Sequence, residues 1–144
     1  MNKPDIKNLK VIQAPLAGIS DIVYRKLIRN YGGKNTLLTT EMISSEAIYQ
    51  VPNSNIIKYD EIEYPLSFQI VGHKPHLMAH AAKLLEERAS VIDINCGCPV
   101  GKIVKGSDGC SLMRNIPLAE AIIKEVRKAI KKPLSVKFRL GWSQ

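Results

Sequence analysis

Short apolar runs alternate with helix-length amphipathic segments along the chain, and this alternation restricts the fold more than any other feature of the sequence. The runs are four to seven residues long and are bounded by Gly, Pro or polar residues, as is typical of buried strands. Predicted strands cover residues 11–14, 36–40, 65–71, 91–95 and 134–140. Predicted helices cover residues 21–31, 44–50, 75–88 and 117–130. Strands that alternate with helices form a parallel sheet, so the predicted fold class is α/β.

We predict a parallel (β/α) barrel of the TIM type that is incomplete, with about five of eight strands present. A closed barrel of this type needs roughly 250 residues, whereas the chain has 144. Residues 1–144 are therefore interpreted as one unit, the N-terminal portion of a barrel domain. An open half-barrel should leave sheet edges and apolar interior surface exposed.

The charge balance favours a polyanionic partner. The chain has 21 Lys and Arg against 13 Asp and Glu, a formal net charge of +8, and such cations can displace counterions from a phosphate backbone. Its three cysteines are odd in number and closely spaced, which argues against a disulfide framework. No apolar run approaches the roughly 20 residues of a membrane span. We therefore expect a cytoplasmic protein with reduced thiols and no membrane partner.

One predicted strand ends in a loop that carries two thiols. Residues 91–94 (VIDI) are followed by residues 95–99 (NCGCP), and neither Gly97 nor Pro99 suits a strand interior. Cys98 should therefore lie at the carboxyl end of a parallel strand, where α/β folds usually carry their chemistry. This placement makes Cys98 a candidate catalytic thiol.

Four segments of the chain together resemble the tRNA-dihydrouridine synthases. They are residues 14–21 (APLAGISD), 93–99 (DINCGCP), 102–105 (KIVK) and 136–141 (VKFRLG), and the similarity extends from about residue 10 to 142. The resemblance implies a flavin-dependent TIM barrel in which NADPH reduces FMN, and the flavin passes hydride to C6 of a uridine in tRNA. It also implies later barrel strands that hold the FMN phosphate, and a helical tRNA-binding domain, both absent from these 144 residues.

The resemblance assigns Cys98 as the acid that protonates C5 of the uracil. A thiol suits this task, because its ordinary pKa of about 8.5 keeps it mostly protonated at neutral pH. The alternative is a small buried residue, since free cysteines are often buried. For Cys96 and Cys110 we favour that packing role.

Five residues are expected to bind the cofactor, by resemblance. The backbone of Pro15, Leu16 and Ala17 should touch the isoalloxazine, and the Gln69 amide should hydrogen-bond it. Lys137 should face the end of the ring system where negative charge builds on reduction. The alternatives are ordinary turn chemistry for the first loop and an outward-facing lysine at position 137.

Substrate contacts are predicted for Asn95, Lys102, Lys105 and Arg139. An amide such as that of Asn95 can donate to a base carbonyl and accept from its N–H, although it could instead cap the local backbone at the strand end. Lys102 and Lys105 follow the thiol loop and are candidates for tRNA contact. Arg139 shares a strand face with Lys137.

No metal site is predicted. His73, His76 and His80 stand three and four residues apart, but His73 precedes Pro75 and should lie before the helix begins. We interpret these histidines, and the basic residues of segment 124–132, as solvated helix positions.

Two alternatives to tRNA reduction stay open. The first is an FMN-dependent dehydrogenase that acts on a free pyrimidine. The second is an inactive, truncated or split fragment of the tRNA enzyme, whose partner would be a complementing C-terminal fragment in addition to tRNA and NAD(P)H.

Overall fold

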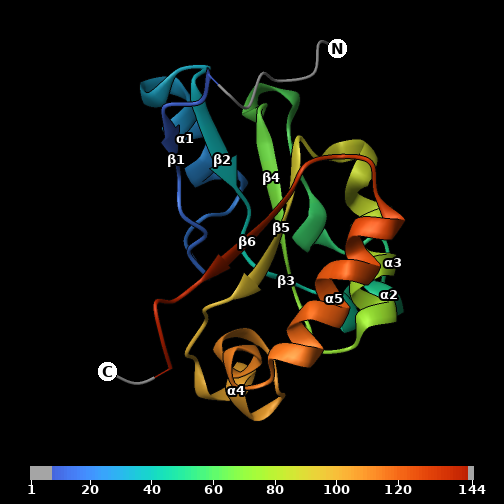
Figure 1. The fold of residues 1–144 in the computed structure, drawn as a ribbon. Coiled ribbons are helices and arrows are strands. Elements are labelled where there is room, and N and C mark those ends of the chain that lie inside the picture. Colours follow the sequence, from blue (N-terminus) through green and yellow to red (C-terminus); the bar gives the residue numbers. More distant parts are fainter. Residues whose placement is uncertain (1–7, 143–144) are drawn as a thin grey trace.

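The structure, a computed structural model, describes residues 8–142, except for the side chain of Lys102. Its centre is a parallel sheet curled into a half-barrel, with the strand order β1-β2-β4-β5-β6 and β3 beside β4 (Figure 1). The strands are β1 (Val11–Ile12), β2 (Thr36–Thr39), β3 (Ile43–Ser44), β4 (Leu66–Val71), β5 (Val91–Cys96) and β6 (Leu134–Phe138). The predicted incomplete (β/α) barrel is confirmed. The prediction missed β3, because a strand of two residues leaves no periodic pattern.

Two of the predicted strands are two residues shorter than expected, and hydrogen-bond pairing explains both. β6 pairs with β5 only as far as Phe138, which lies opposite Cys96, the last residue of β5. The predicted extension of β6 to Leu140 is therefore wrong, because no partner strand continues beyond Cys96. β1 ends at Ile12 instead of Ala14, since its paired register with β2 stops at Leu37.

The helices follow the predicted alternation, with additions. They are α1 (Ile22–Gly32), α2 (Ser45–Gln50), α3 (Pro75–Leu85), α4 (Gly101–Lys105) and α5 (Ile116–Ala129), with 3₁₀ turns η2 (Asn55–Ile57), η3 (Glu61–Glu63), η4 (Glu86–Arg88) and η5 (Gly109–Arg114). The Asp21 carboxylate caps α1 by accepting the Tyr24 N–H, and Gly33 ends it at φ +62°. The two elements α4 and η5 were not predicted, because glycines in that segment lower its helix propensity.

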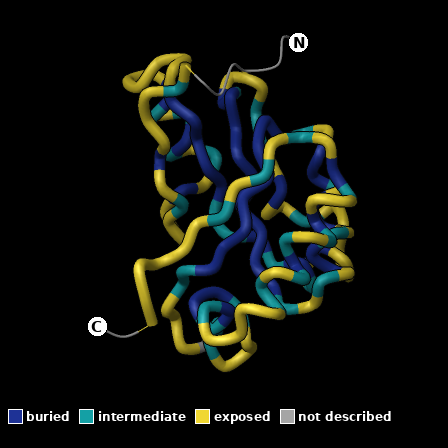
Figure 2. The backbone as a smooth tube through the Cα atoms, in the orientation of Figure 1, coloured by how far each residue is buried: buried dark blue, intermediate teal, exposed yellow. Residues whose placement is uncertain are grey.

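The hydrophobic core lies between the convex face of the sheet and the helices α2, α3 and α5 (Figures 1 and 2). Every residue of β4 and β5 is buried, whereas the edge strand β1 and the end of β6 are exposed. Phe138, for example, is 65% exposed. The expected exposure of the half-barrel edges is thus confirmed.

The Glu86 carboxylate joins η4 to the segment before β6. It accepts hydrogen bonds from the backbone N–H groups of Lys131 and Lys132, at 2.5 and 3.2 Å, and from Lys83 Nζ at 2.7 Å. The bond from Lys83 is the main cause that lowers the pKa of Glu86 to about 2. The charged form of this buried side chain is therefore part of the folded state.

Replacing Glu86 with glutamine is expected to lower the free energy of unfolding at pH 7 by about 1–3 kcal/mol, the usual range for a charge-assisted hydrogen bond. Because the folded-state pKa lies below the ordinary value, this contribution is complete above about pH 4.5 and disappears as the pH falls towards 2. Urea denaturation at pH 7 and pH 3 measures it. An equal difference between the two proteins at both pH values would contradict the assignment.

Candidate active site

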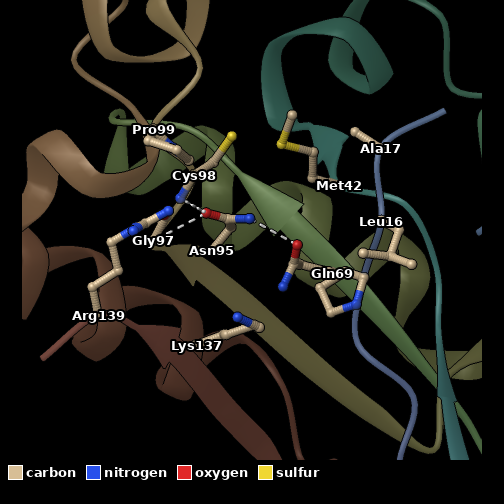
Figure 3. Close-up of a pocket in the computed structure, with 11 residues that line it drawn as sticks. Leu16, Ala17, Met42, Gln69, Asn95, Gly97, Cys98, Pro99, Lys137 and Arg139 are labelled. Atoms are coloured by element: carbon tan, nitrogen blue, oxygen red, sulfur yellow. Dashed lines mark hydrogen bonds between the residues drawn. The ribbon is translucent and has the colours of Figure 1, made fainter. Parts of the chain in front are cut away.

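A cavity of about 310 Å³ opens at the carboxyl ends of β4, β5 and β6, beside the loop that follows β1 (Figure 3). Gln69 comes from β4, Asn95 from β5 and Lys137 from β6. The lining residues are Pro15, Leu16, Ala17, Met42, Gln69, Asn95, Gly97, Cys98, Pro99, Lys137 and Arg139. Segments far apart in the sequence meet here because all the strands are parallel and end at the same side of the sheet.

Most of the predicted site residues line this cavity: Pro15, Leu16, Ala17, Gln69, Asn95, Cys98, Lys137 and Arg139. Lys105 lines a neighbouring cavity instead, and the Lys102 side chain lies outside the described part of the structure. Sequence reasoning missed Met42. Its position three residues after the end of β2 could have identified it, because that strand ends at the same side.

The backbone around Cys98 is held from two directions. Asn95 Oδ1 accepts hydrogen bonds from the N–H groups of Gly97 and Cys98, at 3.1 and 3.0 Å, and the Cys98 carbonyl accepts from Cys110 N–H at 3.1 Å. The Cys98 side chain is half-buried, and Figure 3 shows its sulfur pointing away from Asn95 and into the pocket. A fixed loop and a free thiol are what proton delivery to a bound ligand requires.

Gly109 lets the segment after α4 pack directly on this thiol loop. Its φ is +59°, and a Cβ added there would lie 2.7 Å from the Cys98 carbonyl oxygen and 3.2 Å from the Cys98 Cβ. A larger residue would have to displace Cys98 or leave the left-handed region. Gly109 is therefore a structural determinant of the thiol's position that the sequence analysis did not single out.

A chain of buried side-chain hydrogen bonds runs beneath the cavity. Asn95 Nδ2 donates to Gln69 Oε1 at 2.8 Å, and Gln69 Nε2 donates to Asp93 Oδ2 at 2.6 Å. Ser135 Oγ donates to the other Asp93 oxygen at 2.5 Å. These partners fix which end of each amide is the donor. Each amide nitrogen keeps one N–H for a ligand.

Asn95 thus performs the strand-end capping that the sequence left open as an alternative to substrate contact. Its oxygen is fully used by Gly97 and Cys98. Its remaining donor and its place in the cavity wall keep a ligand contact as a proposal.

The three thiols differ in their surroundings. Burial and the nearby Asp93 carboxylate raise the pKa of Cys96 to about 11, and Cys110 is also buried. The predicted packing role of both is confirmed. Only Cys98, of these three, borders the candidate active-site cavity.

At pH 8, iodoacetamide is therefore expected to label Cys98 at least about tenfold faster than Cys96, because alkylation requires an accessible thiolate. A raised pKa keeps the Cys96 sulfur protonated at this pH, and burial shields Cys110. Peptide mass spectrometry after timed labelling measures the three rates. Faster labelling of Cys96 than of Cys98 would contradict the described geometry.

The described structure holds no group of three or more His, Cys, Asp or Glu side chains suited to a metal ion. None of the helices within residues 8–142 has the length and apolar character of a membrane span. His76 and His80 are exposed, as predicted. His73 is not solvated as predicted, because it is half-buried and its Nδ1 lies 2.8 Å from Asp108 Oδ1. The lysines of α5 are solvated as expected, and Lys124 and Lys128 pair with Glu120 and Glu125.

Comparisons with known proteins agree with one another. The family model described as Dihydrouridine synthase (Dus) matches residues 12–144. The chain is 42% identical over 135 residues to Probable tRNA-dihydrouridine synthase 1 of Synechocystis sp., covering 92% of this chain and 38% of that protein. It is 39% identical over 140 residues to tRNA-dihydrouridine synthase B of Shewanella oneidensis, covering 95% and 42%. The chain therefore spans about two fifths of the length of the curated relatives it matches.

Proposed function

This chain belongs to the dihydrouridine synthase family, and from that premise we propose that it takes part in the flavin-dependent reduction of uridine to 5,6-dihydrouridine in tRNA. The observation that carries the proposal is the meeting of the Cys98 thiol, the Gln69 amide and the Lys137 ammonium around one cavity. An acid, a hydrogen-bonding amide and a cation are the groups that reduction of a pyrimidine beside a flavin would use.

The residues present fit FMN as the cofactor. The candidate active-site cavity of about 310 Å³ adjoins the concave face of the sheet. A cavity of about 480 Å³ on that concave face shares Pro15 and Lys137 with it. Lys137 and the free N–H of Gln69 would hold the pyrimidine end of the ring system, and the backbone of residues 15–17 would contact the ring. When bound, FMN reduced by NADPH supplies the hydride that adds to C6 of the uracil.

Cys98 would deliver the proton that completes the reduction. Hydride addition at C6 leaves carbanion and enolate character at C5 and O4, so C5 must gain a proton. A thiol is mostly protonated at neutral pH and can give it. Asn95 would hold the Cys98 backbone in place and could donate its remaining N–H to a uracil carbonyl.

Cations near the cavity support a polyanionic substrate. Within residues 8–142, no carboxylate lies within ion-pair distance of Lys105, Lys137 or Arg139. Arg139 Nε donates to the Gly97 carbonyl at 2.7 Å, which orients its guanidinium beside the thiol loop. We propose that Lys102, Lys105 and Arg139 contact the tRNA backbone, and that residues 1–144 are the N-terminal portion of the catalytic barrel.

The test is to supply the chain with FMN, NADPH and unmodified tRNA, and to look for dihydrouridine by nucleoside mass spectrometry. Parallel reactions contain uracil or orotate in place of tRNA, or add a fragment of a relative that carries the later part of the barrel. Formation of dihydrouridine in tRNA is expected, alone or with the complementing fragment. Turnover of free pyrimidines without turnover of tRNA would overturn the proposal.

A further inference from the structure

A second cavity, of about 500 Å³, lies directly beside the candidate active site. The two share Pro99, which follows the thiol, and Arg139, at the end of β6. Its other lining residues are Gly101, Val104 and Lys105 of α4, Cys110, Gly141 and Trp142. A ligand that fills the first cavity and continues beyond it along this wall would enter the second.

Trp142 gives this second cavity a flat aromatic surface. It is the only tryptophan of the sequence and is 46% exposed. The Arg114 guanidinium carbon lies 5.0 Å from the centre of its ring, a cation–π distance. Arg114 and Trp142 therefore form a cation–π pair, and aromatic surfaces of this kind stack on nucleobases of any sequence.

Positive charge without an acidic partner lies around this cavity. Within the described residues, Lys105 and Arg139 in its wall, and Arg114 over the Trp142 ring, have no carboxylate within ion-pair distance. Cations without acidic partners beside a stacking surface suit a ligand that alternates flat bases with phosphates.

We infer that this second cavity binds the nucleotide next to the target uridine on the same RNA strand, with its base on the Trp142–Arg114 pair and its phosphate near Lys105 and Arg139. This inference rests on the proposed function, because it takes RNA as the substrate. A subsite here would hold the strand while the target base occupies the cavity that contains Cys98.

The binding test uses a 5′-labelled uridine pentanucleotide, whose affinity is measured by fluorescence anisotropy. Trp142→Leu is expected to weaken binding about tenfold, the loss typical of one base–aromatic stack, and Trp142→Phe should restore part of it. Arg114→Gln should weaken binding at least about threefold and make it less dependent on salt. The matched controls Lys124→Gln and Lys128→Gln remove carboxylate-paired cations from α5 and should change affinity by less than about twofold. Thermal unfolding of each variant checks that it is folded.

The intrinsic fluorescence of the single tryptophan reports on the same contact without any substitution. The unlabelled pentanucleotide is expected to quench it, and NADP⁺ at the same concentration, which unlike NADPH does not absorb where tryptophan emits, is not. Absence of binding, unchanged affinity of Trp142→Leu, or binding without quenching would each overturn the subsite. Displacement of the oligonucleotide by NADPH would instead assign this surface to the dinucleotide and overturn the RNA inference.

The dihydrouridine assay separates failure of the subsite from failure of the proposed function. Trp142→Leu is expected to raise KM for tRNA while leaving kcat and flavin binding close to their original values. Dihydrouridine formation with an unchanged KM in this variant removes the subsite and leaves the function standing. Quenching and weakened binding without any dihydrouridine formation would remove the function while the RNA contact remains.

Discussion

Replacing Cys98 with alanine is expected to lower the rate of dihydrouridine formation by at least about a hundredfold, the usual lower limit for loss of a positioned general acid. The half-buried Cys98 side chain faces the cavity, and its loop is held by backbone groups that alanine retains. The variant should therefore fold and keep its flavin. Bound flavin is measured after dialysis as absorbance in the blue, which makes the protein yellow. Single-turnover assays with prereduced flavin and unmodified tRNA measure the acid step directly.

Cys110→Ala is the matched control, because it removes a neighbouring thiol that is buried and does not border the cavity containing Cys98. Its rate should stay within about threefold of the original, since the Cys110 N–H that holds the Cys98 carbonyl is unchanged. Full activity of Cys98→Ala would remove this thiol from the mechanism. Loss of flavin in Cys98→Ala would assign it to cofactor binding instead of proton transfer.

The second large effect concerns stability. Glu63→Gln is expected to lower the free energy of unfolding by about 3–5 kcal/mol, because it leaves the Arg25 charge buried without a counter-charge. Glu63 is fully buried, and its Oε2 accepts from Arg25 Nε at 2.5 Å. Its Oε1 also accepts the Asp60 N–H at 2.7 Å. This carboxylate is therefore the main electrostatic link between α1 and η3.

Urea denaturation followed by far-ultraviolet circular dichroism measures the loss. Asp60→Asn at the same junction is the matched control, because it neutralises the half-exposed ion pair with Lys26 while keeping an oxygen that can cap η3. Its effect should be much smaller, since solvent screens exposed pairs. Equal destabilisation by the two substitutions would show that burial of the Arg25–Glu63 pair does not set its energy.

The packing of α1 illustrates what local pattern could not reveal. Its buried residues are Arg25 and Arg29, while Val23, Leu27 and Tyr31 are exposed. Arg29 donates to the carbonyls of Thr36, Glu63 and Pro65, at 2.8, 2.7 and 3.1 Å, and burial lowers its pKa. A helix that binds to its sheet through guanidinium groups shows no apolar stripe facing inward. Its mode of attachment therefore depends on carbonyls that come from two other segments, at residue 36 and at residues 63–65.

Local sequence pattern predicted the active site only in part, as it did the packing of α1. The short apolar run before Asn95 and the glycine and proline around Cys98 were enough to place the thiol at a strand's carboxyl end. They could not show that the Asn95 amide is shared between the loop backbone and Gln69. That sharing requires β4 and β5 to be neighbours in a specific register, with Gln69 opposite Asp93.

The sequence by itself predicted the parallel α/β class, the order of the main elements and the end of the sheet where the chemistry should lie. These follow from hydrophobic periodicity and from glycine and proline, whose effects act within a few residues. Only the tertiary structure decided which amide protons remain free, and that Arg114 lies over the ring of Trp142 in the wall of a cavity beside the candidate active site. Such contacts join segments that are distant along the chain, so they depend on how strands pair and helices pack, and no local pattern encodes them.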